Sequence, residues 1–256
     1  MQIDGKAAIV TGGGTGVGRE TGLLLARGGC SVVVNYSRSR DEAEQTARDI
    51  EALGVKALVV RADVSHDDDC RRMVQQARDA LGRIDVLVNN AGTTRFIAAD
   101  DLEEVKDDDW QRIMGVNVVG AFHCARAVKE PMLASGGGVI VNVSSVSGFL
   151  GRGSSIPYAA SKGALNNLTI ALARVLAPKI RVCAVAPGFI TGRWLQKGLG
   201  ENYEQVKKSY EDKLPLARVC DPRDIAQAIL SLITGSDMVT GQVLICDAGM
   251  MIADRA

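Results

Sequence analysis

Residues 6–18 read KAAIVTGGGTGVG, a short apolar run that passes directly into a glycine-rich turn. Lys6–Thr11 has the length and the apolar content of a buried strand, and the residues after the turn fit a helix. Glycine permits positive φ and close approach of the backbone, and the free N–H groups at a helix N-terminus attract a phosphate. The stretch therefore predicts a strand, a phosphate-binding turn and a helix in that order.

The spacing of the glycines differs from two familiar phosphate-binding patterns. Gly12, Gly16 and Gly18 give G-x-x-x-G-x-G rather than G-x-G-x-x-G, and no Lys-Ser or Lys-Thr follows, as a P-loop requires. A tight turn without a ligand is the alternative interpretation, but the strand before the turn and the helix after it favour a dinucleotide site. The candidate cofactor-binding residues in the turn are Gly12, Gly14, Thr15, Gly16, Val17 and Gly18.

Strand and helix patterns alternate along the rest of the chain. Short valine-rich runs predict strands at 6–11, 31–36, 56–61, 84–89, 138–144, 180–185 and 242–246. Helical stretches separate them at 16–28, 40–53, 66–81, 107–134, 156–177 and 222–234. This order is typical of βαβ units, so we predict an α/β fold with a doubly wound, seven-stranded parallel sheet flanked by helices.

No linker or repeat divides the chain, so residues 1–256 are expected to form one domain. The least periodic stretch is 188–215, which carries Trp194, Tyr203 and Tyr210 among charged residues. Long irregular insertions near the carboxyl ends of strands tend to be lids or substrate loops. We expect 188–215 to be an irregular, mobile flap in which Trp194 is a candidate for covering substrate.

Composition excludes several functional classes. Thirty basic and thirty acidic residues give no net charge, which predicts neither a nucleic-acid partner nor a membrane partner. The six cysteines lie at least 26 residues apart, so they predict neither a metal site nor disulfides and fit a cytoplasmic, reducing location. Only two histidines are present, and neither His66 nor His123 has a motif around it, which argues against a Ser-His-Asp hydrolase.

The end of the second predicted strand bears on which dinucleotide binds. An acidic residue about 20 positions after the glycines would bind the ribose 2′-hydroxyl of NAD. This chain has Tyr36, Ser37 and Arg38 there, and its first acid is Asp41. A guanidinium in place of a carboxylate favours the 2′-phosphate of NADP, with NAD as the open alternative.

Tyr158 and Lys162 are the most informative pair for catalysis. They are four residues apart, so on a helix they share one face. A nearby ammonium favours the phenolate, so we expect Lys162 to lower the pKa of Tyr158 toward neutrality. The hydroxyl of Ser145 could hold a substrate oxygen. By itself, such a pair is more often an ordinary surface contact than a catalytic one.

These features together resemble the short-chain dehydrogenase/reductase family, including its 3-oxoacyl-carrier-protein reductase-like members. The resemblance rests on TGGGTGVG, on Asn89-Asn-Ala-Gly92, on Ser145 thirteen residues before Tyr158-x-x-x-Lys162, and on Pro187-Gly188. It runs from Lys6 to Asp247-Ala-Gly249. It implies a single-domain Rossmann fold, a homotetramer, and a catalytic tetrad of Asn117, Ser145, Tyr158 and Lys162.

The resemblance also implies roles. Tyr158 exchanges the proton, Ser145 holds the substrate oxygen, Lys162 binds the nicotinamide ribose, and Asn117 supports a water. Further residues implied at the cofactor are Asp63 and Val64 at the adenine, Asn90, Ala91 and Gly92 at the adjoining ribose, and Pro187, Gly188, Ile190 and Thr191 at the nicotinamide.

Two positions depart from the family pattern. Family members often place a threonine five residues after the proline, where this chain has Gly192. The 3-oxoacyl-carrier-protein reductases carry basic residues just before the fifth strand, where this chain has Ser135-Gly-Gly-Gly138. The resemblance predicts an NAD(P)-dependent oxidoreductase that interconverts a small-molecule carbonyl and a secondary alcohol. The alternative is a non-catalytic redox sensor that binds the dinucleotide.

Overall fold

The computed structural model describes residues 1–253, and its centre is one parallel sheet. The seven strands lie in the order β3-β2-β1-β4-β5-β6-β7, and every neighbouring pair is parallel. Their bounds are β1 Ala7–Val10, β2 Ser31–Tyr36, β3 Ala57–Arg61, β4 Val86–Asn89, β5 Gly138–Val143, β6 Ile180–Pro187 and β7 Val243–Cys246. The predicted doubly wound sheet is confirmed. Because the strand order reverses between β1 and β4, a crevice forms beyond their carboxyl ends.

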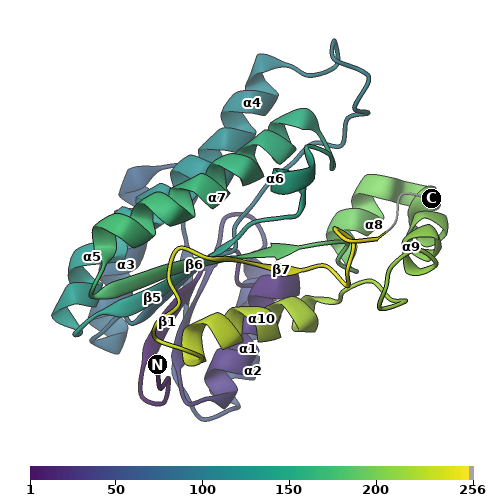
Figure 1. The fold of residues 1–256 in the computed structure, drawn as a ribbon. Coiled ribbons are helices and arrows are strands. Elements are labelled where there is room, and N and C mark those ends of the chain that lie inside the picture. Colours follow the sequence, from purple (N-terminus) through teal and green to yellow (C-terminus); the bar gives the residue numbers. More distant parts are fainter. Residues whose placement is uncertain (254–256) are drawn as a thin grey trace.

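Helices cover both faces of the sheet (Figure 1). On one face α1, α2 and α10 enclose an apolar core, and on the other α3, α5 and α7 enclose a second. The helix bounds are α1 Gly16–Arg27, α2 Arg40–Glu51, α3 Asp67–Leu81, α4 Asp107–Met114, α5 Gly120–Ala134, α6 Ser147–Leu150, α7 Ile156–Leu176, α8 Arg193–Leu199, α9 Tyr203–Glu211 and α10 Pro222–Thr234. Seven of these fall in the six helical stretches that the sequence predicts, because the stretch 107–134 contains both α4 and α5.

The predicted helix over 107–134 is not continuous. A π-helical turn, Gly115–Val119, separates α4 from α5. Glycine at both ends of this turn and three valines within it weaken the ordinary helical geometry. The Val64 side chain also lies so close to Gly120 that a Cβ there would be 2.7 Å from Val64 Cγ2. π-helical turns occur frequently at functional sites, and this one carries Asn117.

The expectation of an irregular flap over 188–215 is wrong in one respect, because most of the stretch is helical. It contains α8, a 3₁₀ turn at Gly200–Asn202, and α9. The Tyr203 and Tyr210 rings of α9 pack on Phe189, with ring centroids 6.1 and 5.1 Å from the Phe189 ring. This small apolar cluster stabilises the helix despite its many charged residues. Figure 1 shows α8 and α9 lying together beyond the carboxyl ends of β6 and β7.

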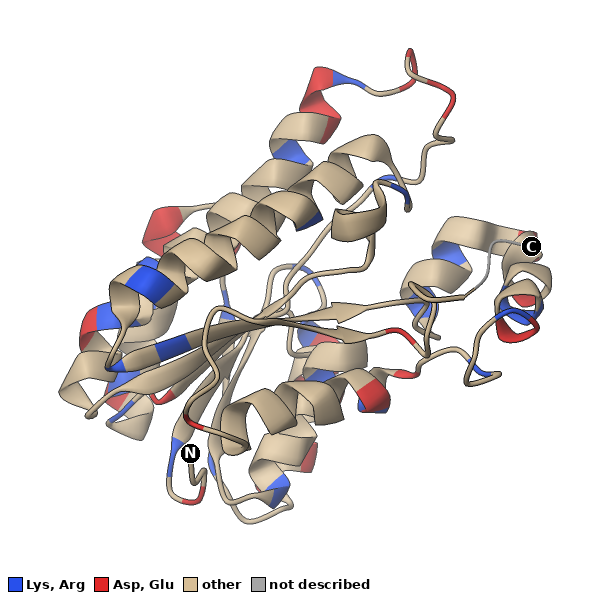
Figure 2. Cartoon of the chain, in the orientation of Figure 1, with Lys and Arg blue, Asp and Glu red and all other residues tan. Residues whose placement is uncertain are grey.

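Charged residues of both signs are interspersed over the helices (Figure 2). The exception is the loop before α4 together with the first turn of α4, where acidic residues gather between Asp100 and Asp109. No helix within residues 1–253 is long and apolar enough to cross a membrane.

Candidate active site

The glycine-rich turn lies between β1 and α1. It is held by side chains at the ends of β2 and β4, the two strands that flank β1. The Asn35 amide oxygen accepts from Gly12 N at 3.2 Å, and the Asn90 amide donates to the carbonyls of Thr11 and Gly12 at 2.9 and 3.0 Å. Gly12 has φ +60°, which favours glycine. A Cβ on Gly18 would collide with the Gly12 carbonyl oxygen. The backbone of the turn is therefore fixed in place by the protein itself.

The N-terminus of α1 opens beyond this turn and fits a phosphate. Thr15 is the N-cap residue, but its side chain makes no capping hydrogen bond, and no acidic residue stands in the first turn. Gly16 has φ +52°, and a Cβ there would meet nothing within 4 Å. Free N–H groups, a hydroxyl that makes no capping bond and open space are what a dinucleotide pyrophosphate needs at this position.

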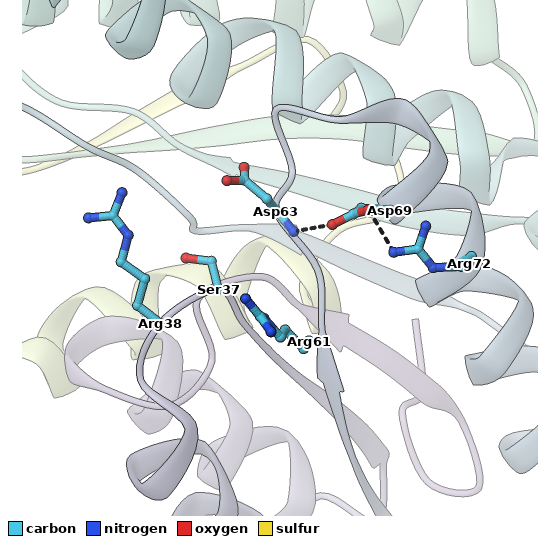
Figure 3. A pocket seen from close by; sticks show the side chains of 6 residues that line it. All are labelled: Ser37, Arg38, Arg61, Asp63, Asp69 and Arg72. Carbon is cyan, nitrogen blue, oxygen red and sulfur yellow. Dashed lines mark hydrogen bonds and ion pairs between the residues drawn. The ribbon is translucent and has the colours of Figure 1, made fainter.

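A cavity of about 330 Å³ adjoins the carboxyl ends of β2 and β3. Figure 3 shows its lining, in which Arg38 lies on one side and Arg61 lies beside Ser37. The Asp69 carboxylate accepts from Asp63 N at 2.9 Å and pairs with the Arg72 guanidinium at 2.6 Å. It therefore joins the segment after β3 to α3 on the remaining side of the cavity.

The cavity is positive on its β2–β3 side. Neither Arg38 nor Arg61 makes an ion pair with any residue between 1 and 253, whereas Arg72 is neutralised by Asp69. Arg61 was missed by the sequence reasoning. The signal lies in the strand register, which places Arg61 opposite Tyr36, next to Ser37 and Arg38. Tyr36 is half-buried at the end of β2, and Val64 is buried in the segment between β3 and α3.

Ser145, Tyr158 and Lys162 meet at the other side of the crevice. Tyr158 and Lys162 lie one turn apart on α7, and Lys162 Nζ is 5.5 Å from the centroid of the Tyr158 ring. The helix begins at Ser155, whose hydroxyl accepts from Tyr158 N at 3.4 Å. Ser145 follows β5, and its hydroxyl donates to Ser147 Oγ and accepts from Ser147 N, each at 3.1 Å.

The pKa of Tyr158 moves in the direction opposite to the sequence-based expectation. Burial raises it to about 12, and a hydrogen bond with Ser145 opposes this only in part. The Lys162 ammonium does not offset burial, because it donates to the Val143 carbonyl at 2.8 Å instead of the phenol. Burial also lowers the pKa of Lys162 to about 8. In this structure Tyr158 is thus a neutral phenol at pH 7, and Lys162 is a buried cation.

Asn117 lies on the π-helical turn, and its side chain is fully occupied by the protein. It accepts from Thr93 N at 2.8 Å and donates to Thr93 O and to Ser161 Oγ, each at 3.0 Å. Ser161 directly precedes Lys162 on α7. The amide of Asn117 therefore ties the segment after β4 to the helix that carries Tyr158 and Lys162.

The remaining predicted residues lie at the mouth of the crevice. Ala91 N donates to Thr11 Oγ1 at 3.0 Å, Gly188 N to Cys246 O at 3.1 Å, and Thr191 N to Cys220 O at 2.8 Å. Pro187 ends β6, and Ile190 forms an isolated bridge with Cys220. All of them are fixed through the backbone, beside the ends of β1, β6 and β7.

Trp194 of α8 lies at this mouth, and its covering of substrate stays a prediction. Its ring centroid lies 6.4 Å from that of Tyr158, and its Cη2 would be 3.8 Å from a Cβ placed on Gly92. The segment after α6 closes the opposite side, since a Cβ on Gly153 would lie 3.6 Å from the Tyr158 ring. Arg193, which the sequence reasoning missed, reaches from the same helix to Thr15.

Comparisons with known proteins agree with this geometry. The sequence profile described as short chain dehydrogenase matches residues 6–202. A protein of Streptomyces violaceoruber described as ketoacyl reductase 2 of the granaticin polyketide synthase is 42% identical over 246 residues, 96% of each chain. A 3-oxoacyl-[acyl-carrier-protein] reductase of Synechocystis sp. is 36% identical over 253 residues, 98% of each chain.

Among solved structures, a short-chain dehydrogenase/reductase from Burkholderia xenovorans superposes with a TM-score of 0.90 at 35% identity. The match covers 97% of this chain and 98% of that one. These relatives are named as reductases or dehydrogenases, and none of them supports a non-catalytic redox sensor. The chain binds a nicotinamide dinucleotide and interconverts a carbonyl and an alcohol, and it belongs to the short-chain dehydrogenase family.

Proposed function

We propose that Tyr158 is the proton carrier and that Ser145 orients the reacting oxygen. The observation that carries this assignment is the convergence of both hydroxyls with Lys162 at the crevice, under Trp194. A phenol with a pKa of about 12 is protonated at pH 7, as a donor to a carbonyl oxygen must be. In reduction Tyr158 gives its proton to that oxygen, and in oxidation it takes the proton back.

Lys162 and Asn117 support this proton transfer. When a carbonyl is reduced, negative charge passes to Tyr158 as its proton leaves, and a cation one turn away stabilises that charge. Lys162 would also bind the ribose of the nicotinamide nucleotide. Asn117 positions α7 against the segment after β4 through Ser161 and Thr93.

The bound dinucleotide supplies the hydride, so the protein has to bind it and orient it. The glycine-rich turn and the N-terminus of α1 would hold its pyrophosphate, and Asp63, Val64, Asn90, Ala91 and Gly92 would hold the adenosine half. Pro187, Gly188, Ile190 and Thr191 would hold the nicotinamide half.

The cofactor is NADP rather than NAD, and two unpaired guanidinium groups support this preference. Arg38 and Arg61 line the same cavity beside Ser37, and no carboxylate ends β2. Guanidinium groups bind phosphate through charge-assisted hydrogen bonds. Arg61→Gln should therefore weaken NADPH binding about 10-fold and leave NADH binding within about twofold. Equal losses for both dinucleotides would contradict the assignment.

The protein assembles as a homotetramer in the cytoplasm. Two exposed apolar regions support self-association. Val119, Phe122 and Ile170 lie along the outer helices, and Leu244 and Ile245 lie on β7, which is the edge strand of the sheet. Edge strands and apolar patches of this kind are sites of association. The six cysteines are all free, which suits a reducing compartment.

The decisive test is a screen of carbonyls and secondary alcohols with NADPH and NADH in parallel. The names of the relatives direct the screen to 3-oxoacyl thioesters first, both free and carrier-bound. We expect oxidation of NADPH with at least one ketone and a slower reaction with NADH. Binding of NADPH without turnover of any carbonyl or alcohol would contradict the proposed function, and a preference for NADH would contradict the assigned cofactor.

A further inference from the structure

Arg193 is the first residue of α8 and links the flap to two segments of the cofactor half. Its Nη2 donates to Thr15 Oγ1 at 3.1 Å, and its Nη1 pairs with Glu42 Oε1 at 2.7 Å. Thr15 is 178 positions away along the chain and Glu42 is 151. The guanidinium therefore lies directly over the N-terminus of α1.

The charges around this position favour an anion. No acidic residue stands in the first turn of α1, and the N-terminus carries the positive end of the helix dipole. Arg19, the cation within α1 nearest the turn, is engaged elsewhere, with Asp49 Oδ2 at 2.7 Å and Thr46 Oγ1 at 3.3 Å. Arg193 is thus the guanidinium that contacts the N-cap residue.

Neither hydrogen bond of Arg193 is built into the core. Its side chain is 61% exposed and that of Glu42 is 45% exposed, so the ion pair itself contributes little to stability. The Thr15 hydroxyl makes no capping bond and is free to share a ligand. An exposed guanidinium held over unsatisfied N–H donors is arranged for a phosphate group rather than for folding.

Arg193 also stands next to Trp194, whose ring lies over Tyr158. A phosphate contact at Arg193 would hold α8 in place and keep Trp194 at the substrate side. The same short helix therefore reaches both halves of the crevice. Gly192 directly precedes Arg193 and has φ +130°.

We infer that Arg193 binds the pyrophosphate of the dinucleotide and so fastens the flap over the cofactor. This inference rests on the proposed function, because it takes the glycine-rich turn as the pyrophosphate site. It adds a phosphate-binding residue from outside the glycine-rich turn. Cofactor binding would then also hold α8, and with it Trp194, beside Tyr158.

The test measures direct binding by isothermal titration calorimetry, without turnover. Arg193→Gln should weaken NADPH binding about 10-fold or more, as expected for loss of a charge-assisted hydrogen bond. Lys197→Gln, which removes an exposed cation from the same helix, should change the dissociation constant by less than about twofold. Adenosine 2′-monophosphate, which has the 2′-phosphate of NADPH but neither phosphate of the pyrophosphate, should bind Arg193→Gln and wild type alike.

Glu42→Gln separates phosphate binding from simple fastening of the flap to α2. If Arg193 binds phosphate, removing its carboxylate partner leaves NADPH affinity unchanged or tighter. If Glu42→Gln weakens NADPH as much as Arg193→Gln does, the inference is overturned. It is also overturned if Arg193→Gln binds NADPH like wild type. Failure of wild type itself to bind NADPH would instead contradict the proposed function.

Discussion

The glycine-rich turn and the flap face the same crevice but are held in different ways. The turn is fixed by hydrogen bonds from Asn35 and Asn90, and a single Cβ at Gly18 would not fit. The flap reaches the crevice through Arg193 and Trp194, whose exposed fractions are 61% and 44%. The cofactor half is therefore rigid before anything binds, whereas the substrate half depends on two exposed side chains.

This difference predicts how variants should behave. A change in the rigid half should affect folding and binding together, because each group there has several partners. A change in the flap should alter ligand binding and leave folding intact.

Apart from the loss of the Tyr158 hydroxyl itself, Lys162→Met should have the largest effect. It removes the cation beside Tyr158, so kcat should fall by about 100-fold or more. The measurement is steady-state turnover with NADPH at saturating carbonyl. Lys197→Met on α8 is the control, and it should retain wild-type kcat.

The same variant tests the lowered pKa of Lys162. The folded protein loses this proton near pH 8, whereas the unfolded chain keeps it to about pH 10.5. Between these values the unfolded state binds more protons, so the free energy of unfolding of wild type should rise relative to Lys162→Met. Urea unfolding at pH 7.5, 9 and 10 measures it, and parallel pH profiles of the two proteins would contradict the burial of a charged lysine.

Gly18→Ala should affect both stability and binding. Its Cβ would collide with the Gly12 carbonyl oxygen and lie 2.6 Å from Asn90 Nδ2. Overpacking of this kind costs about 1–3 kcal/mol of unfolding free energy, and the displaced turn should bind NADPH at least about 10-fold more weakly. Gly115→Ala is the control, since its nearest new contact is Ser65 Cβ at 3.9 Å. A Gly18→Ala protein with wild-type stability and affinity would show that the turn is not rigid.

Trp194→Ala should have the smallest effect and a different signature. Its KM for the carbonyl should rise about 5–10-fold, because the aromatic wall beside Tyr158 is lost. Its unfolding free energy should stay within about 0.5 kcal/mol of wild type, since the side chain is exposed. Trp110→Ala, which removes a similarly exposed ring, is the control. A large loss of stability in Trp194→Ala would mean that the flap is part of the core.

Most of the fold could be predicted from the sequence because its signals are local. Valine-rich runs mark the strands, and the glycine-rich turn marks the start of α1, so the sheet and the elements that bring Ser145 and Tyr158 together followed directly. The helix α9 was missed because its stability depends on Phe189, which lies outside the helix and before α8 in the sequence.

The parts of the site that could not be predicted depend on contacts between distant segments. Arg61 joins the cofactor cavity only through the register of β3 on β2. Arg193 reaches Thr15 only because α8 folds back over α1. The direction of the Tyr158 pKa shift was predicted wrongly, because the spacing of Lys162 on a helix says nothing about burial or about the competing Val143 carbonyl.

The most direct test of Tyr158 as the proton carrier is the Tyr158→Phe variant, with turnover and NADPH binding measured on the same preparation. The variant keeps the ring that faces Trp194 and removes only the hydroxyl that carries the proton. We predict that kcat falls by about 1000-fold or more, while the dissociation constant for NADPH changes by less than about twofold. Turnover close to that of wild type in this variant would contradict the claim that Tyr158 is the proton carrier.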